Sequence, residues 1–232
     1  SSKPVVWTMH DLWPASGICH YAHGCYRYEN GCGNCPLLPG RGSSNDLSSK
    51  VWKRKKAVYH HGNMWFVTCS QWLARQAKRS GLLRGISVRS IPNPIDTHIF
   101  EPQDKQKARQ QLQLPEDKRL ILFVSQRVTD QRKGMDYFID AIDKMVVEHP
   151  EMKDNTGIAI LGGHAEELEG KLALPVYPIG YVTDQQRIRD VYNAANVFVL
   201  PSLEDNLPNT IMEAMACGVP CVGFKVGGIP EM

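Results

Sequence analysis

Short apolar runs of strand length alternate along the chain with segments whose apolar residues recur at the helical period. Most of these runs are apolar at consecutive positions, which is typical of strands buried on both faces. The runs cover residues 4–9, 64–69, 86–91, 119–125, 157–162, 173–179, 196–201 and 219–224. Amphipathic helices are predicted between them over residues 46–60, 70–80, 134–149 and 184–195. Repeated strand–helix–strand units imply parallel sheets covered by helices, so the predicted fold class is α/β.

The segment IPNPIDTHIFEP (91–102) is the predicted domain boundary, because it holds three prolines and no sustained period. It divides the chain into two Rossmann-like domains, 1–97 and 98–232, with a cleft between them. Ligands of such folds bind at the carboxyl ends of strands, beside helix N-termini. The chain starts almost directly on a strand and stops where a helix should begin. We therefore expect both domains to be incomplete in this chain.

Charge is distributed unevenly between the two predicted domains. Residues 1–96 carry 13 Lys and Arg against four Asp and Glu, whereas residues 97–232 carry 14 against 20. The basic half favours an anionic partner, such as a phosphate-bearing acceptor, an anionic membrane surface or nucleic acid. The sequence contains no run of eighteen apolar residues, so we expect no membrane-spanning helix.

The predicted helix 46–60 concentrates this positive charge. Its inward face is expected to hold Leu47, Val51, Trp52, Val58 and Tyr59. The remaining surface is expected to hold Lys50, Lys53, Arg54, Lys55 and Lys56. Such a run is either a solvated face or a surface for peripheral contact with an anionic inner leaflet. The aromatic residues between 47 and 95 lie in core patterns and form no stacking platform, so nucleic acid is not an expected partner.

A basic loop, QRVTDQRKG, follows the strand 119–125 and leads into the helix 134–149. It places Arg127 and Lys133 at the mouth of a strand–loop–helix unit, where phosphate groups bind readily. Fixed cations there can hold a diphosphate and stabilise it as a leaving group. The alternative is that Arg127, Arg132 and Lys133 are solvated loop charges.

A second loop–helix junction, EDNLPNTIMEAMACG (204–218), follows the strand 196–201. Pro208 suits the first position of a helix, and the amides around it would be donors to an anion. These amides belong to Leu207, Asn209 and Thr210. Glu213 can accept two hydrogen bonds from a diol such as a ribose, and Asp205 can hold hydroxyl groups. The alternative is that Glu213 is a surface helix residue and Asp205 a turn-former.

The order of these segments resembles the family-4 glycosyltransferases of the GT-B fold, also described as glycosyl transferases group 1. The resemblance rests on EDNLPNTIMEAMACGVPCV followed by GGIPE, on Arg127 and Lys133 with Gly134, and on the hinge-like IPNPIDTHIF. TMHD (8–11), in the other half of the chain, resembles the histidine-containing strand end of the acceptor domain. The resemblance therefore covers nearly the whole chain, in the expected order. HDLWP (10–14) with its Cys-rich loop is similar to exopolysaccharide transferases of the colanic-acid type.

The resemblance implies roles for individual residues. Glu213 would hold the nucleotide ribose, Asp205 would contact the donor sugar, and Arg127 and Lys133 would hold the diphosphate. Backbone groups of Asn206, Leu207 and Asn209 would line the sugar pocket. His10 would face the reacting centre from the other domain, and Glu231 would lie near the nucleotide. Members of the family generally need no metal and retain the anomeric configuration, so no cofactor for catalysis is expected.

The sequence departs from the family pattern at three points. The first carboxylate is Asp205 rather than Glu, with Glu204 beside it, which leaves open which of the two reaches the sugar. The spacing from Arg127 to Lys133 is one residue longer than usual, so Arg132 is an alternative to Lys133. The turn NLPN replaces a Gly-rich turn, which bears on the sugar accepted.

Four cysteines gather in the predicted loop 15–45: Cys19, Cys25, Cys32 and Cys35. Cys32-Gly-Asn-Cys35 has the spacing of half a zinc knuckle, and the other two thiolates would complete a structural zinc site. Four independent thiols are an equal alternative, and a disulfide pair is a third.

The expected activity is that of a hexosyl-type glycosyltransferase in polysaccharide biosynthesis. It would move a sugar from a nucleotide-diphosphate sugar to a glycan or lipid-linked acceptor. The expected location is cytoplasmic, at the inner membrane face if helix 46–60 contacts lipid. Alternatives are a nucleotide-sugar 2-epimerase or a phosphorylase of the same fold, or a zinc-stabilised basic binding protein.

Overall fold

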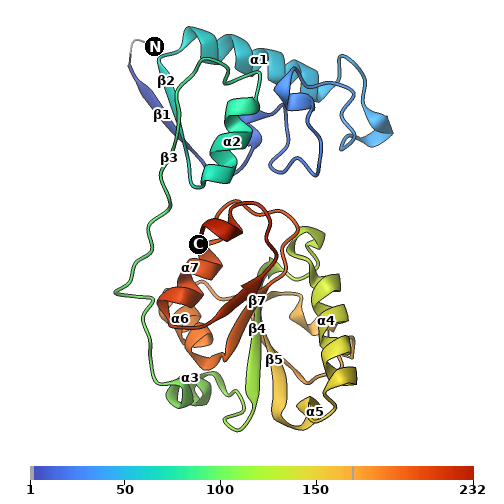
Figure 1. The fold of residues 1–232 in the computed structure, drawn as a ribbon, viewed down its shortest axis with the longest axis vertical. Coiled ribbons are helices and arrows are strands. Elements are labelled where there is room, and N and C mark those ends of the chain that lie inside the picture. The colour runs from blue at the N-terminus through green and yellow to red at the C-terminus, as the bar shows by residue number, and fades with distance from the viewer. Residues whose placement is uncertain (1–2, 169) are drawn as a thin grey trace. The chain divides into compact units, whose positions relative to one another are not determined.

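The computed structural model describes residues 3–168 and 170–232 (Figure 1). The chain divides into two compact units, and each is described by itself. The first is made of the chain up to Asn93, together with residues 204–207 and 227–231. The second is made of residues 94–203 and 208–226 with Met232. Both contain parallel sheets with intervening helices, which confirms the predicted α/β class.

The sheet of the first unit has the order β1-β2-β3, with all pairs parallel. Its register places Val5 opposite Met64 and Phe66 opposite Val88. The described elements are β1 (Val5–Met9), α1 (Leu47–His61), β2 (Met64–Thr68), α2 (Gln71–Arg79) and β3 (Val88–Ser90). Short 3-10 turns occur at Trp13–Ala15, Arg27–Glu29, Pro39–Arg41 and Ile229–Glu231.

Aromatic side chains of α1 and the strands fill the core of the first unit. Trp52 and Tyr59 of α1 pack with Phe66 of β2, and Leu73 and Ala77 contribute from α2. Tyr59 meets Phe66 edge-on at 5.1 Å between ring centroids. The sheet is therefore fixed against α1, and the loop that follows β1 begins from a rigid base.

The second unit holds a parallel sheet of order β6-β5-β4-β7-β8. Figure 1 shows α4 on one side of this sheet and α6 and α7 on the other. The strands are β4 (Arg119–Arg127), β5 (Thr156–Gly163), β6 (Val176–Gly180), β7 (Val197–Leu200) and β8 (Cys221–Gly223). The helices are α3 (Lys105–Leu112), α4 (Met135–Glu148), α5 (Met152–Asn155), α6 (Gln185–Ala194) and α7 (Asn209–Ala216), with 3-10 turns at Gln131–Lys133 and Ala165–Leu168.

The central strand β4 explains why continuous apolar runs appear in the sequence. Six consecutive residues, 120–125, are buried, because helices cover both faces of the strand. Phe123 contacts Phe138 of α4 with ring centroids 5.4 Å apart. The carboxyl ends of β4 and β7, at which the predicted site lies, thus emerge from the buried centre of the sheet.

Helix α3 lies directly after the predicted boundary segment and was not predicted. Its sequence KQKARQQL offers few apolar residues, so the hydrophobic pattern was too weak to reveal a helix. Asp104 caps it by accepting a hydrogen bond from Lys107 N at 2.8 Å. Arg109 anchors it, because its buried guanidinium donates to the carbonyls of Ala194 and Lys118.

None of the helices in the described part of the chain is both long enough and apolar enough to cross a membrane.

Candidate active site

The loop between β4 and α4 is held by backbone geometry rather than by side-chain packing. Asp130 accepts a hydrogen bond from Arg132 N at 3.0 Å and so caps the turn Gln131–Lys133. Gly134 then adopts a left-handed conformation with φ +73° and starts α4. A Cβ at this position would lie 1.9 Å from the carbonyl oxygen of Pro201, so a side chain has no room there. The loop is therefore fixed against Pro201, the residue that follows β7.

Arg127 is exposed at the carboxyl end of β4. It lines an open cavity of about 320 Å³ together with Gln126, Thr129 and Asp130. Lys133 follows in the same loop and is half-buried. Arg132, the alternative to Lys133, has its guanidinium 3.3 Å from Asp130 Oδ2, where the carboxylate offsets its charge. Its position at the open cavity favours Arg127 as a cation that can meet an anionic ligand. The choice between Lys133 and Arg132 as the second cation stays a prediction.

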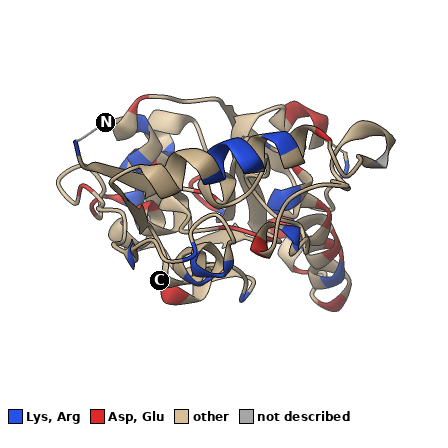
Figure 2. Ribbon diagram, turned by 90° about the horizontal axis from the view of Figure 1, so that it is seen from above, with Lys and Arg blue, Asp and Glu red and all other residues tan. Residues whose placement is uncertain are grey.

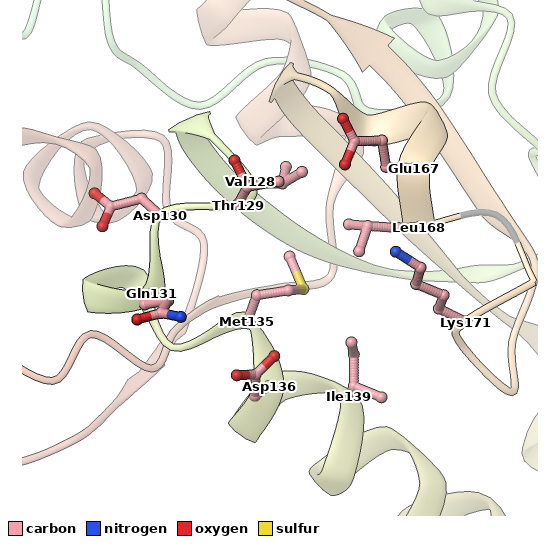
Figure 3. Close-up of a pocket in the computed structure, with 10 residues that line it drawn as sticks. All are labelled: Val128, Thr129, Asp130, Gln131, Met135, Asp136, Ile139, Glu167, Leu168 and Lys171. Atoms are coloured by element: carbon pink, nitrogen blue, oxygen red, sulfur yellow. The ribbon is translucent and has the colours of Figure 1, made fainter.

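A second, smaller cavity of about 150 Å³ lies between this loop, α4 and the Ala165–Leu168 turn (Figure 3). Its apolar wall comes from Val128, Met135 and Ile139. Figure 3 shows the carboxylates of Asp130, Asp136 and Glu167 around it, with Lys171 nearby. Three carboxylates against one ammonium repel a diphosphate. The cavity beside Arg127 is therefore the better candidate for an anion.

Helix α7 begins at Asn209, with Pro208 at the cap position. The proline therefore precedes the helix by one residue, instead of occupying its first position as predicted. The amides of Asn209 and Thr210 belong to the first turn, where no intrahelical carbonyl is available to them. Thr210 Oγ1 is buried and has no hydrogen-bond partner among the described residues. The Thr210 hydroxyl at the start of α7 is thus a polar group that a ligand can hydrogen-bond.

Glu213 lies in the second turn of α7 and is half-buried. Its Oε2 accepts a hydrogen bond from the hydroxyl of Tyr192 on α6, at 2.7 Å. Burial raises the pKa of Glu213 above its usual value, and the bond from Tyr192 opposes that rise. Tyr192 was missed by the sequence analysis. The available signal was a hydroxyl within the apolar stripe of the predicted helix 184–195, since a buried tyrosine hydroxyl needs a partner.

In the first unit, His10 and Asn206 lie together. His10 follows β1 and is exposed, and its backbone carbonyl accepts a hydrogen bond from Asn206 Nδ2 at 3.0 Å. The amide oxygen of Asn206 accepts from the Ser70 hydroxyl at the N-terminus of α2. His10 Nδ1 lies 3.3 Å from the sulfur of Cys69, which is buried. The backbone and ring of His10 are both held by neighbours.

The two adjacent acids of the first unit differ in their surroundings. Asp205 is 5% exposed, and its Oδ1 accepts from Asn206 N at 3.1 Å. Its carbonyl accepts from Gly228 N at 3.0 Å, and a Cβ on Gly227 would lie 1.8 Å from that oxygen. Glu204 is half-buried and accepts from His23 N at 3.1 Å, in the Cys-rich loop. Leu207, the residue after Asn206, is half-buried. The contact of either acid with a donor sugar stays a prediction.

Glu231 caps α2 within the first unit. Its two carboxylate oxygens accept from Gln71 N and Trp72 N, each at 2.6 Å. Negative charge at a helix N-terminus is favourable because the first amides are unsatisfied there. Arg75 adds a contact at 3.4 Å. The nucleotide contact expected of Glu231 stays a prediction, and the capping role is one that sequence spacing did not reveal.

Helix α1 organises the Cys-rich loop through its N-terminal cap and a lysine in its middle. Asp46 caps the helix at Ser49 N and also accepts from Cys35 N at 2.8 Å. Lys55 donates to the carbonyls of Trp13, Ser16 and Gly17 at 2.6–3.1 Å. Its side chain is 7% exposed, so the prediction that Lys55 lies on the basic surface is wrong. Burial lowers the pKa of this ammonium to about 8.

The predicted inward face of α1 is correct for Trp52 and Tyr59 and wrong for Leu47 and Val58, which are more than half exposed. The structure leaves Lys50, Lys53, Arg54 and Lys56 exposed on this helix. Figure 2 shows Lys and Arg gathered along α1.

All four cysteines of the loop are free thiols in the structure. Burial, together with the neighbouring Cys35, Cys32 and Cys25, raises the pKa of Cys19 to about 12. In the described part of the chain, no group of three or more Cys, His, Asp or Glu is arranged to hold a metal ion. Structural zinc stays a prediction, which elemental analysis of the purified protein tests.

Residues 118–232 match the family described as "Glycosyl transferases group 1". D-inositol 3-phosphate glycosyltransferase 2 of Catenulispora acidiphila is 32% identical over 152 residues, which are 60% of this chain and 35% of that protein. The corresponding enzyme of Acidothermus cellulolyticus is 32% identical over 155 residues, covering 61% and 34% of the two chains. This chain thus spans about a third of the length of these curated relatives.

The solved structures with the same fold match nearly the whole chain. Sucrose-phosphate synthase from Thermosynechococcus elongatus has a TM-score of 0.67 at 23% identity, covering 97% of this chain and 51% of that one. HepE from Anabaena, solved in complex with UDP and glucose, has a TM-score of 0.66 at 18% identity, covering 99% and 55%. WaaG, described as a glycosyltransferase involved in lipopolysaccharide biosynthesis, has a TM-score of 0.68 at 15% identity, and the match covers 100% of this chain and 60% of that one. At these identities the likeness shows the GT-B fold.

Proposed function

We propose that the complete protein is a group 1 glycosyltransferase of the GT-B fold. It moves a sugar from a nucleotide-diphosphate sugar to a glycan or lipid-linked acceptor, as in exopolysaccharide biosynthesis. One observation carries the proposal: the loop with Arg127 and Lys133 is fixed by Gly134 against the carbonyl of Pro201, in the same unit as the open first turn of α7. The match of residues 118–232 to the family supports it.

In this proposal the second unit binds the donor. Arg127 and Lys133 hold the diphosphate, and fixed cations stabilise the negative charge that develops as the sugar leaves. The amides that open α7 add donors of fixed direction. Glu213 accepts hydrogen bonds from the ribose. These groups let the transfer proceed without a metal, and a retaining outcome needs no protein nucleophile.

The first unit contributes the groups on the side of the donor sugar and the acceptor. Asp205, with Glu204 beside it, holds sugar hydroxyls, and the backbone around Asn206 and Leu207 lines the pocket. His10 faces the reacting centre. Its carbonyl bond to Asn206 fixes the backbone of β1 to the segment that carries Asp205.

We further propose that the basic stripe of α1, defined as Lys50, Lys53, Arg54 and Lys56, contacts an anionic membrane surface. All four side chains are exposed, and no acid lies between residues 47 and 95 to offset them. Each basic residue near such a surface contributes about 1 kcal/mol of attraction. The protein then works in the cytoplasm at the inner face of the membrane, where a lipid-linked acceptor is held.

The experiment that tests the activity is a turnover assay with a panel of nucleotide-diphosphate sugars and membrane-extracted acceptors. The proposal predicts that free nucleotide and a glycosylated acceptor form together, that chelator has no effect, and that the product is the retained anomer by NMR. Turnover of the nucleotide sugar without acceptor would instead indicate an epimerase. A requirement for free phosphate would indicate a phosphorylase.

A further inference from the structure

Tyr192 and Glu213 form a pair that the family resemblance does not account for. The hydroxyl of Tyr192 lies 2.7 Å from Glu213 Oε2, and the two residues come from different helices, α6 and α7. Tyr192 is fully buried. Its ring lies edge-on to Phe198 of β7, with centroids 5.9 Å apart, and to Phe100, at 6.3 Å. The ring cannot turn away, so its hydroxyl stays directed at the carboxylate.

The hydroxyl of Tyr192 acts as a donor over the whole physiological range. Burial raises the pKa of Tyr192 well above its usual value, and the charge of Glu213 raises it further. The proton therefore stays on the tyrosine, and Glu213 is the acceptor. This bond stabilises the ionised form of a half-buried carboxylate, against the burial that favours its protonated form.

The other titratable groups around the pair do not replace this bond. Burial raises the pKa of Cys217, at the end of α7, to about 12, and that of Cys221, on β8, to about 11, so both thiols stay neutral. Arg189, one turn before Tyr192 on α6, is paired with Asp190 at 2.7 Å. Tyr192 is thus the group that directs the Glu213 carboxylate and stabilises its ionised form.

We propose that Tyr192 is a positioning residue for ribose recognition. It holds Oε2 of Glu213 in one direction and keeps the carboxylate ionised, so that the remaining lone pairs accept from the ribose hydroxyls of the donor. The inference rests on the proposed function, in which Glu213 binds that ribose. It adds that selection of a ribonucleotide over its 2′-deoxy form depends on a residue that the ligand does not touch.

The test compares Tyr192→Phe with the wild type of the complete protein. UDP, GDP and ADP, each with its 2′-deoxy form, are titrated by calorimetry from pH 5 to pH 8. Tyr192→Phe is expected to weaken ribonucleotide binding at pH 7 by about tenfold, the scale of one lost hydrogen bond to a charged group. The preference for ribose over deoxyribose should fall by a similar factor. The maximum rate at saturating donor should change much less than KM.

The pH dependence of ribonucleotide binding distinguishes a positioning role of the Tyr192 hydroxyl from a role of its ring in packing alone. Without the hydroxyl, the pKa of Glu213 rises, so its carboxylate becomes protonated at a higher pH. As the pH is lowered, ribonucleotide binding by Tyr192→Phe should therefore weaken at a higher pH than binding by the wild type. Tyr177→Phe is the control for loss of a tyrosine hydroxyl, because Tyr177 is another tyrosine of the second unit, half-buried on β6. It should leave the pH profile and the ribose preference unchanged. NMR titration of the Glu213 carboxyl in both variants measures the same pKa shift without any ligand.

The outcomes distinguish the inference from the proposed function. If the wild type prefers ribose and Tyr192→Phe changes neither this preference nor the Glu213 pKa, the positioning role is overturned. If the wild type binds no nucleoside diphosphate, the proposed function fails, and a pKa rise by NMR would still support the Tyr192–Glu213 coupling.

Discussion

Gly134 lies directly against the carbonyl oxygen of Pro201. The distance from an added Cβ to that oxygen would be 1.9 Å, and the residue has φ +73°. A second link joins the same two loops, since Leu203 N donates to the carbonyl of Arg132 at 2.8 Å. The loop that carries Arg127 and Lys133 therefore cannot move independently of the end of β7.

Replacing Gly134 with alanine should displace this junction. The methyl group clashes with backbone, which no side-chain rotation relieves, and the left-handed conformation adds strain. We expect a loss of about 2–3 kcal/mol in the free energy of unfolding, and weaker binding of nucleoside diphosphates. Urea denaturation and calorimetry measure the two effects.

Gly170→Ala is the control for conformation without a clash. Gly170 has φ +74°, and apart from its chain neighbours no atom of the described residues lies within 4 Å of an added Cβ. This variant should lose about 1 kcal/mol and keep ligand binding. If Gly134→Ala and Gly170→Ala lost the same free energy of unfolding and the same ligand affinity, the contact of Gly134 with Pro201 would not matter.

Lys55→Met should destabilise the first unit by about 3 kcal/mol, because three carbonyls that now accept from the buried ammonium would lose their donor. Lys53→Met, an exposed change on the same helix, should cost less than about 0.5 kcal/mol. Denaturant midpoints of the two variants test this. A Lys55→Met variant as stable as Lys53→Met would mean that the ammonium does not hold the loop.

The Asp46 carboxylate should make a pH-dependent contribution to the stability of the folded protein. Hydrogen bonds from Cys35 N and Ser48 Oγ, with further bonds from Ser49 N and Ser43 N, hold the pKa of this carboxyl well below its usual value. Because the folded pKa is depressed, the contribution is fully present above the unfolded pKa near 3.8 and is lost as pH falls from there through the folded pKa. Asp46→Asn should therefore lower Tm by a constant amount from pH 7 to about pH 5. In stronger acid, the difference in Tm between the wild type and the variant should become smaller.

The matched variant for Asp46 is Asp184→Asn, which alters another helix cap. Asp184 accepts from Arg187 N at 2.9 Å and lacks a contact with the Cys-rich loop. Its effect on Tm should be smaller. The role of Asp46 would be contradicted if Asp184→Asn lowered Tm more than Asp46→Asn does. It would also be contradicted if the Tm difference between Asp46→Asn and the wild type grew larger in acid.

Replacing the basic stripe of α1 with glutamine should abolish binding to vesicles of anionic lipid. Four charges contribute roughly 4 kcal/mol near such a surface, which is about a thousandfold in affinity. The charge-matched control replaces exposed residues of the second unit: Lys107, Arg119, Lys144 and Lys153. Co-sedimentation with phosphatidylglycerol vesicles compares the two. Equal losses in both variants would show only a general effect of net charge.

The sequence predicted the strands and the long helices well, because burial on both faces leaves continuous apolar runs such as residues 120–124. It failed where structure depends on a few polar contacts. Helix α3 has little apolar signal and is held by Asp104 and the buried Arg109. Lys55 was assigned to the surface because charge is a poor guide to burial when backbone carbonyls surround an ammonium.

The candidate site could be predicted in parts. Motif spacing singled out Arg127 at the end of β4, Lys133 in the loop before α4 and Glu213 in the second turn of α7. Their roles in binding stay predictions. Motif spacing could not reveal Tyr192, because the contact with Glu213 joins residues 21 apart through two helices. It also could not reveal that Glu231 caps α2, a contact across about 160 residues of sequence. Long-range polar pairs leave no periodic trace.

The most direct test of the central claim is calorimetry of the complete protein with a panel of nucleotide-diphosphate sugars and with an oligonucleotide. The account predicts saturable binding of at least one nucleotide sugar, marked weakening of that binding in Glu213→Ala, and no binding of the oligonucleotide. Binding of the oligonucleotide with no binding of any nucleotide sugar would contradict it.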